Sequence, residues 1–248
     1  MTSLSAPMFF TEDPEADVAR LKQLQSDDPI AWQDALNTSR AVVEAVKEND
    51  IEELRRVVAN AEQGELIQAF TIQSFVMALK ASSLEMVQQF VDWGMPLQSA
   101  SLSQVLHLVC EMVSRENFSN SWRILKVLAD GNAYGGLDIN TPRSSDGWTP
   151  LCIACAGACL PLAFKLLELK ADPNVITRSN ETPLSLAKRA QPEDNEEQRE
   201  ARGIISNMLR SYGAQDSYKD VLRISRKQAK EINVASEPVS KSHTRYRG

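Results

Sequence analysis

The stretch that decides the fold is DGWTPLCIACAGACLPLAFKLLELKADPN, residues 146–174. Its tripeptide Thr149–Leu151 reappears thirty-three residues later as Thr182–Leu184, and Ala154 is matched at the same spacing by Ala187. Matches at one fixed spacing indicate an internal repeat, and periods of roughly 20–50 residues are typical of stacked solenoids.

The N-terminal half contains a second pair with the same period. The segment AVKENDIEELRRVV begins at Ala45, and its counterpart ALKASSLEMVQQFV begins at Ala78, thirty-three residues later. A less regular copy follows, with LHLVC (106–110) in the place of its first helix and RILKVLADG (123–131) in the place of its second. Insertions interrupt this copy at residues 114–121 and 132–136.

These residues resemble the ankyrin repeat. Residues 146–174 carry its hairpin Asp-Gly, its Thr-Pro-Leu helix start, a small pair at Ala154–Cys155, a leucine pair at Leu166–Leu167 and a closing Ala-Asp-x-Asn. The resemblance covers roughly Thr38 to Asp216 as five units, of which only the fourth is near the consensus. It implies an all-α solenoid of helix pairs joined by short hairpin turns, because a single pair cannot bury its apolar face alone.

At several positions of the repeat, the residue type has a direct physical reason. Proline in the first helical turn costs no hydrogen bond, and the hydroxyls of Thr149 and Thr182 can cap the helices that follow. Asn180 stands where Gly147 stands one unit earlier, and both residue types tolerate a positive φ. The string LDIN (137–140) parallels ADPN in the next unit.

The last unit departs from the pattern. Ten extra residues, QPEDNEEQRE (191–200), are expected to separate its two helices, and Gly213-Ala214 closes it. On either side of the stack, 38–216, we expect an N-terminal capping extension, 1–37, and a basic C-terminal tail, 217–248. The extension is expected to form a helix around Pro14–Gln25 and another after Asp28-Pro29.

Composition favours a mainly helical globular protein, with 43% hydrophobic and 6% aromatic residues among 248. We expect no signal peptide, no membrane span and free thiols at the four cysteines, hence a protein that is not secreted. The cytoplasm, the nucleus and a cytoskeletal or ciliary structure remain open, and the cytoplasm is the first expectation. The charge is uneven: residues 218–248 carry eight basic and three acidic side chains, or +5, so the total of -6 leaves -11 on the remainder.

The spacing Cys152-x-x-Cys155-x-x-x-Cys159 suggests zinc or an iron-sulfur cluster. The repeat explains all three residues without a metal, since each occupies a small or buried place in a helix pair or its turn. Structural zinc needs four ligands, and a fourth is not evident, although Cys110 occupies the place equivalent to Cys155 one unit earlier. The sequence therefore predicts neither a metal nor another cofactor.

Catalysis is not expected. The two histidines are His107, in a helix-start position where the repeat's usual histidine makes structural hydrogen bonds, and His243 in the tail. The sequence has no order of nucleophile, base and acid, and no glycine-rich phosphate loop. We therefore predict a protein that is not an enzyme.

Two regions are candidates for partner binding. Hairpin tips line the concave surface that repeat stacks use for binding, and Trp148 there could be an anchor or could only cover the neighbouring turn. Arg143 and Arg178 are interpreted as matching places in successive hairpins, which would form a basic ridge. The full set of candidate residues is Arg143, Asp146, Trp148, Arg178, Arg223, Arg226, Lys227, Lys230, Lys241, Arg245, Tyr246 and Arg247.

The tail begins with SYKDVLRISRKQAKEI (217–232), which fits a short helix or an extended docking segment. After Asn233 the composition predicts disorder in isolation.

The sequence supports two functional hypotheses. The first is a non-catalytic scaffold, a structural or adaptor subunit of a larger assembly whose tail binds tubulin or another acidic surface. The second is a regulatory adaptor that binds a signalling enzyme or transcription factor reversibly. Nucleic acid is a weaker candidate partner because the acidic body would be repelled by phosphate, and no membrane partner is expected.

Overall fold

A computed structural model describes residues 22–23, 25–60, 73–95, 97, 102, 104–112, 118–131 and 135–235. The described part is built from helices and contains no β-sheet. Residues 22–23, 25–27 and 73–80 are helical, and the remaining helices are α2 (Pro29–Glu48), α3 (Ile51–Ala59), α5 (Leu84–Asp92), α6 (Val105–Met112), α7 (Phe118–Asp130), α8 (Pro150–Ala156), α9 (Leu160–Glu168), α10 (Pro183–Lys188), α11 (Glu196–Ser211) and α12 (Tyr218–Ala235).

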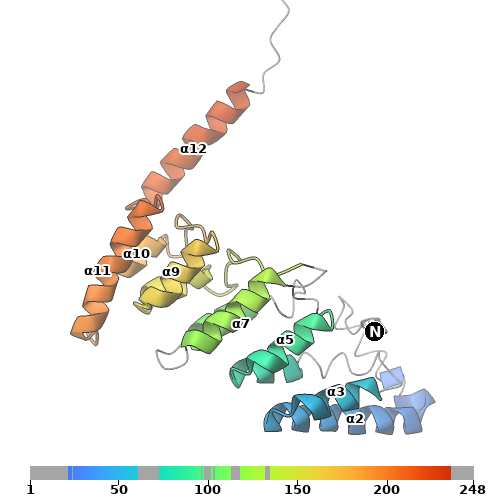
Figure 1. The fold of residues 1–248 in the computed structure, drawn as a ribbon. Coiled ribbons are helices and arrows are strands. Elements are labelled where there is room, and N and C mark those ends of the chain that lie inside the picture. Colours follow the sequence, from blue (N-terminus) through green and yellow to red (C-terminus); the bar gives the residue numbers. More distant parts are fainter. Residues whose placement is uncertain are drawn as a thin grey trace, which may run out of the picture.

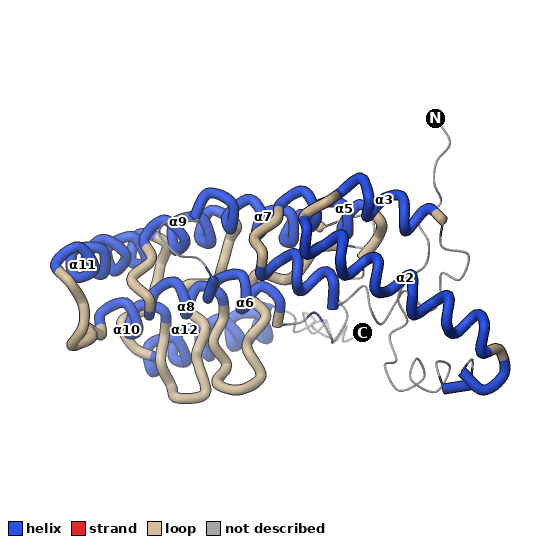
Figure 2. Tube along the Cα trace, turned by 90° about the horizontal axis from the view of Figure 1, so that it is seen from below, coloured by secondary structure: helices blue, strands red, loops and turns tan. Residues whose placement is uncertain are grey.

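The helices stack as pairs in two rows (Figure 2), with α3, α5, α7, α9 and α11 in the outer row. The inner row includes α6, α8 and α10, and the connecting loops project from its side. Each pair packs internally, as α8 does on α9, and each row packs along its length, as α6 does on α8 and α8 on α10. The predicted all-α solenoid of helix pairs is therefore confirmed.

One continuous apolar core runs through the stack. Leu151 and Leu166 are fully buried within it, and so are the small residues Ala154 and Ala163 at the contacts between helices. Small side chains there let the helix backbones approach closely, while the leucines fill the space between neighbouring pairs. The alanine and leucine positions of the repeat thus have the packing roles that the sequence predicts.

The two Thr-Pro-Leu helix starts are capped differently. Pro150 and Pro183 each lie in the first turn, as predicted. Thr182 forms a capping box, because its Oγ1 accepts from the Ser185 N–H at 3.2 Å and the Ser185 Oγ accepts from the Thr182 N–H at 2.8 Å. The predicted cap at Thr149 is wrong: its hydroxyl contacts the Cys152 Sγ, 3.5 Å away, because a cysteine occupies the third helical position.

Asparagine side chains join each loop to the next unit. The Asn140 Oδ1 accepts from the Asp172 N–H at 2.7 Å, and one unit later the Asn174 Oδ1 accepts from the Gln215 N–H at 2.8 Å. These two bonds confirm the predicted parallel between LDIN and ADPN.

Residues 191–200, the acidic insertion of the last unit, are expected to separate its two helices. This expectation is wrong for residues 196–200, the second half of the insertion. Helix α11 already begins at Glu196, where Asn195 and Gln198 form a capping box. Glu196 and Glu197 therefore lie in the first turn of a long helix, where carboxylates are favoured by the helix dipole. The sequence-based boundary failed because the glutamates were interpreted as loop rather than as helix start.

A buried ion pair closes this last unit. Arg202 and Asp194 expose only 6% and 3% of their side chains, and the Arg202 Nε donates to the Asp194 Oδ2 at 2.6 Å. The guanidinium also donates to the carbonyl oxygens of Cys155 at 3.2 Å and Ala156 at 2.9 Å. It thereby satisfies the end of α8 in the preceding unit and holds the insertion against the stack.

At the N-terminal end, α2 is capped by Asp28, whose Oδ1 accepts from the Ala31 N–H at 2.9 Å. This is the helix expected after Asp28-Pro29, and it continues through residue 38 into the first unit. Most of the helix expected around Pro14–Gln25 lies outside the described residues, and the division into 1–37, 38–216 and 217–248 stays a prediction.

Replacing Arg202 by alanine is expected to lower the midpoint of thermal unfolding by roughly 5–10 °C, because it leaves the Asp194 carboxylate buried without its partner. The matched control is Arg199→Ala on the exposed side of the same helix, which should change the midpoint by less than about 2 °C. Equal melting curves of the two variants, followed by circular dichroism, would contradict a stabilising role for the buried pair.

Candidate protein-interaction surfaces

The hairpin before α8 is a rigid projection of the stack. The Arg143 N–H donates to the Trp148 carbonyl at 2.7 Å, and the Gly147 N–H donates back to the Arg143 carbonyl at 2.8 Å. Gly147 has a φ of 76°, and a Cβ there would lie 3.2 Å from the Arg178 backbone nitrogen. Both the backbone conformation and the close approach of the next hairpin favour glycine at this position.

Arg143 is the electrostatic centre of this hairpin. Its Nε and Nη2 donate to the two Asp146 carboxylate oxygens at 3.1 and 2.5 Å, and its Nη1 donates to Glu111 on α6. The Arg143 guanidinium holds the pKa of Asp146 below its ordinary value of 3.8. It also lies 5.6 Å from the centre of the Trp148 ring, within cation–π range.

The predicted basic ridge is wrong. One guanidinium here faces two carboxylates, so the cluster of Arg143, Asp146 and Glu111 has no excess positive charge. The register also differs from the prediction, since the residue bonded across the next hairpin is Thr177, whose N–H donates to the Glu181 carbonyl at 2.9 Å. The first hairpin is one residue longer, so Arg143 and Arg178 do not occupy matching places.

Arg178 is exposed at the tip of that second hairpin. Its backbone N–H donates to the Asp146 carbonyl at 2.9 Å, and its guanidinium donates to the Ser145 carbonyl at 3.3 Å. Trp148 is half-buried and packs against the core. A partner-binding role for either residue stays a prediction.

His107 ties the inner row to the hairpin. It is buried on α6, and its Nε2 lies 2.9 Å from the Trp148 carbonyl oxygen. Because a carbonyl only accepts, Nε2 carries the proton. Burial lowers the pKa of His107 below 6.5, so the ring is neutral at pH 7, and the predicted structural hydrogen bond near the turn is confirmed. Sequence reasoning missed Glu111, although it lies four residues after His107 on the same face of the helix.

The cysteines lie where the repeat interpretation places them. Cys110, Cys152 and Cys155 are buried, and burial raises the pKa of each thiol. Within the described residues, no group of three or more His, Cys, Asp or Glu side chains is placed to hold a metal ion.

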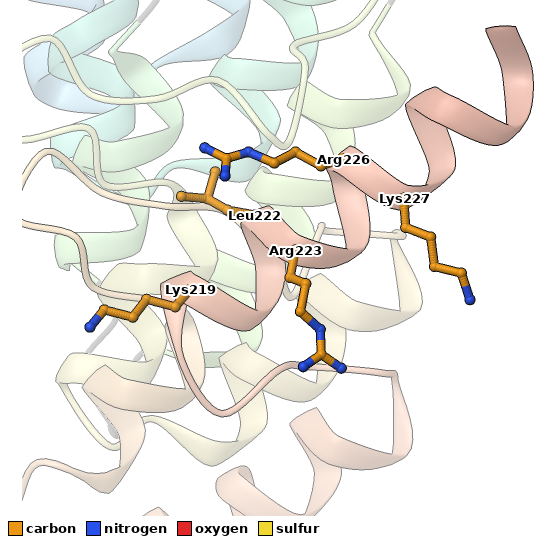
Figure 3. A pocket seen from close by; sticks show the side chains of 5 residues that line it. All are labelled: Lys219, Leu222, Arg223, Arg226 and Lys227. Atoms are coloured by element: carbon orange, nitrogen blue, oxygen red, sulfur yellow. The ribbon is translucent and has the colours of Figure 1, made fainter.

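The first half of the tail is a helix, α12, which settles the alternative left open by the sequence. Arg223, Arg226 and Lys227 lie on it together with Lys219 and Leu222, and these five side chains line a hollow of about 520 Å³ (Figure 3). Lys219 and Leu222 were absent from the candidates, although helical periodicity places them beside the arginines. Lys230 also lies on α12, and the helix includes residues 234 and 235, the first two of the segment expected to be disordered. The rest of that segment, with Lys241, Arg245, Tyr246 and Arg247, lies outside the described residues. None of the described helices is long and apolar enough to cross a membrane.

No family model matches the chain. The curated proteins to which it is similar over 110 residues, 44% of its length, include the following three plant proteins. It is 34% identical to the BTB/POZ domain and ankyrin repeat-containing protein NPR5 of Oryza sativa subsp. japonica, covering 19% of that protein. It is 36% identical to the BTB/POZ domain and ankyrin repeat-containing protein NBCL of Lupinus angustifolius and 34% to the Regulatory protein NPR5 of Arabidopsis thaliana, covering 20% of each.

The chain thus spans about a fifth of the length of these relatives. The names of the first two contain the ankyrin repeat, which agrees with the repeat positions and the helix-pair stack described above.

The buried neutral state of His107 predicts a pH dependence. His107 binds a proton near pH 6.5 in the unfolded chain, but only at a lower pH in the folded chain. The free energy of unfolding should therefore fall as the pH drops through 6.5. His107→Gln keeps a donor for the Trp148 carbonyl without titrating. We expect the wild-type unfolding midpoint in urea to fall more than that of the variant between about pH 7.5 and pH 5.5. Parallel pH profiles would contradict the assignment.

Proposed function

We propose that the chain, as an ankyrin-repeat protein, is a non-catalytic scaffold. In this proposal it serves as an adaptor subunit of a larger protein assembly. Repeat stacks bind partners with an extended surface of inner helices and hairpins, and the described part of this chain presents both (Figure 2).

The observation that carries the proposal is the fixed hairpin before α8. His107 and Glu111 on α6 hold it from one side, and Arg178 of the following hairpin bonds to it from the other. These contacts join three successive units, so the surface is formed before a partner arrives. A preformed surface loses less conformational entropy on binding than a mobile loop, which favours specific recognition.

The tail supplies the second part of the proposal. Residues 218–248 carry +5 against -11 on the remainder, so the tail suits an acidic protein surface. Tubulin-rich filaments are one such surface, and a cytoplasmic, cytoskeletal or ciliary location belongs to the proposal on the same ground. Nucleic acid fits less well, because the acidic body would face the same phosphates as the tail.

A reversible regulatory adaptor is the second candidate function. One observation favours it: a relative from Arabidopsis thaliana is named a regulatory protein. This function would place the partner on the hairpins alone and make the tail dispensable, whereas an assembly subunit would need the tail as well as the hairpins.

Affinity purification with quantitative mass spectrometry separates the two. The assembly proposal predicts that a chain ending after Asp216 loses most co-purifying proteins, while Arg178→Glu at the hairpin tip retains those that the tail binds. The regulatory alternative predicts the reverse, with at least a tenfold loss for Arg178→Glu, a typical effect for a central interface residue. Arg123→Glu on the exposed face of α7 in the outer row is the matched control. Identical partners in equal amounts for all four chains would contradict both functions.

A further inference from the structure

Helix α12 leaves the stack from a fixed base. The Asn174 side chain donates to the Gly213 carbonyl at 3.1 Å and accepts from the Gln215 N–H at 2.8 Å, so it holds both sides of the turn. Asp216 pairs with Lys188 of α10 and, at 3.4 Å, with Arg210 of α11. The direction of the helix is therefore set by the last repeat.

Beyond this base the described part of α12 lies in solvent. Val221 is buried, but every described side chain from Leu222 to Ala229 is exposed. Figure 1 shows the helix extending away from α10 and α11. Its eighteen residues give it a length of roughly 27 Å.

The cations of α12 share one face. Lys219, Arg223, Arg226, Lys227 and Lys230 fall within an arc of about 100° on a helix of 3.6 residues per turn. Four of them line the hollow of about 520 Å³, where their side chains extend from successive turns (Figure 3). Within the described part of the chain, Lys219, Arg223 and Arg226 form no salt bridge with a carboxylate.

An apolar side chain lies beside this arc of cations. Leu222 is 39% exposed and lines the same hollow as Arg223 and Arg226. An exposed leucine among cations offers a ligand an apolar contact beside its charge contacts. A ligand that matches both must carry negative charges and an apolar group close together.

We propose that the face of α12 formed by Lys219, Leu222, Arg223, Arg226 and Lys227, the basic face, binds an acidic protein segment that carries an apolar residue. The proposal rests on the scaffold function and names the site and chemistry of one partner. Cations four residues apart rise by roughly 6 Å along the helix, which matches carboxylates at i and i+4 of a helical segment or at alternate residues of an extended one. The apolar residue of the segment contacts Leu222.

The charge of the body favours a protein segment over a phosphate polymer or a membrane. The remainder of the chain carries a net charge of -11, and this charge would repel an extended anionic surface that contacts α12. A short acidic segment can contact the basic face alone, because charges beyond roughly 8 Å are screened at physiological ionic strength. Leucine within the face also fits a peptide better than a phosphate backbone.

The test uses the full-length chain and a dye-labelled peptide of about sixteen residues that repeats Glu-Glu-Leu-Glu, with a Gln-for-Glu peptide as its uncharged counterpart. Fluorescence anisotropy gives the affinity. The triple variant Lys219→Gln, Arg223→Gln and Arg226→Gln removes three charges and keeps good helix formers. The matched control neutralises three exposed cations elsewhere, Arg40→Gln, Lys80→Gln and Lys126→Gln, with the same change of net charge.

We expect the acidic peptide to bind the wild type and the control about equally and the triple variant about tenfold more weakly. Leu222→Gln should weaken binding several-fold, and the Gln peptide should not bind. Raising the salt from about 50 to about 300 mM should weaken the wild type more than the triple variant.

Equal binding by the triple variant and the control, or no binding of the acidic peptide, would overturn the proposal. So would tighter binding of a single-stranded oligonucleotide or of phosphatidylserine vesicles through the same residues, or self-association that the triple variant abolishes in sedimentation. If the basic face fails while the chain ending after Asp216 still loses co-purifying proteins, only this inference is wrong and the scaffold function stands.

Discussion

The structure depends on one constraint: no helix pair of this chain can bury its apolar side chains without a neighbour. Leu166 and Leu167 on α9 are fully buried only because α7 and α11 lie on either side. The same constraint acts on polar groups, since the Asn140 and Asn174 side chains bond to the backbone of the following unit. Stability is therefore shared between adjacent units along one dimension.

The sequence predicts the regular part of the fold because the repeat places the same residue types in the same environments. The period located the helix pairs, and Pro150, Pro183 and the paired leucines have the expected roles. It fails where one substitution changes a local bond. The Thr149 hydroxyl makes no capping bond to α8 and contacts the Cys152 Sγ instead, whereas Ser185, at the same place in α10, completes the box at Thr182.

The candidate surfaces could be predicted less well, because charge depends on partners that are distant in sequence. The composition of the sequence counts Arg143 as a cation. In the structure its charge is neutralised by Asp146 and by Glu111, which lies thirty-two residues earlier. Arg202 resembles any exposed helix arginine in the sequence, but it is buried against the end of α8. The cations of α12 are the opposite case, since helical periodicity alone places them on one face.

The bonds of Asn174 to Gly213 and Gln215 make the last turn of the stack the pivot about which α12 would tilt. A helix of eighteen residues amplifies rotation at its base, so a tilt of about 10° moves its far end by roughly 5 Å. A ligand or substitution that repacks the closing loop of the last repeat would therefore re-aim α12 without touching any residue on its surface. The position of the Asn174 side chain can in this way decide where the far end of α12 lies.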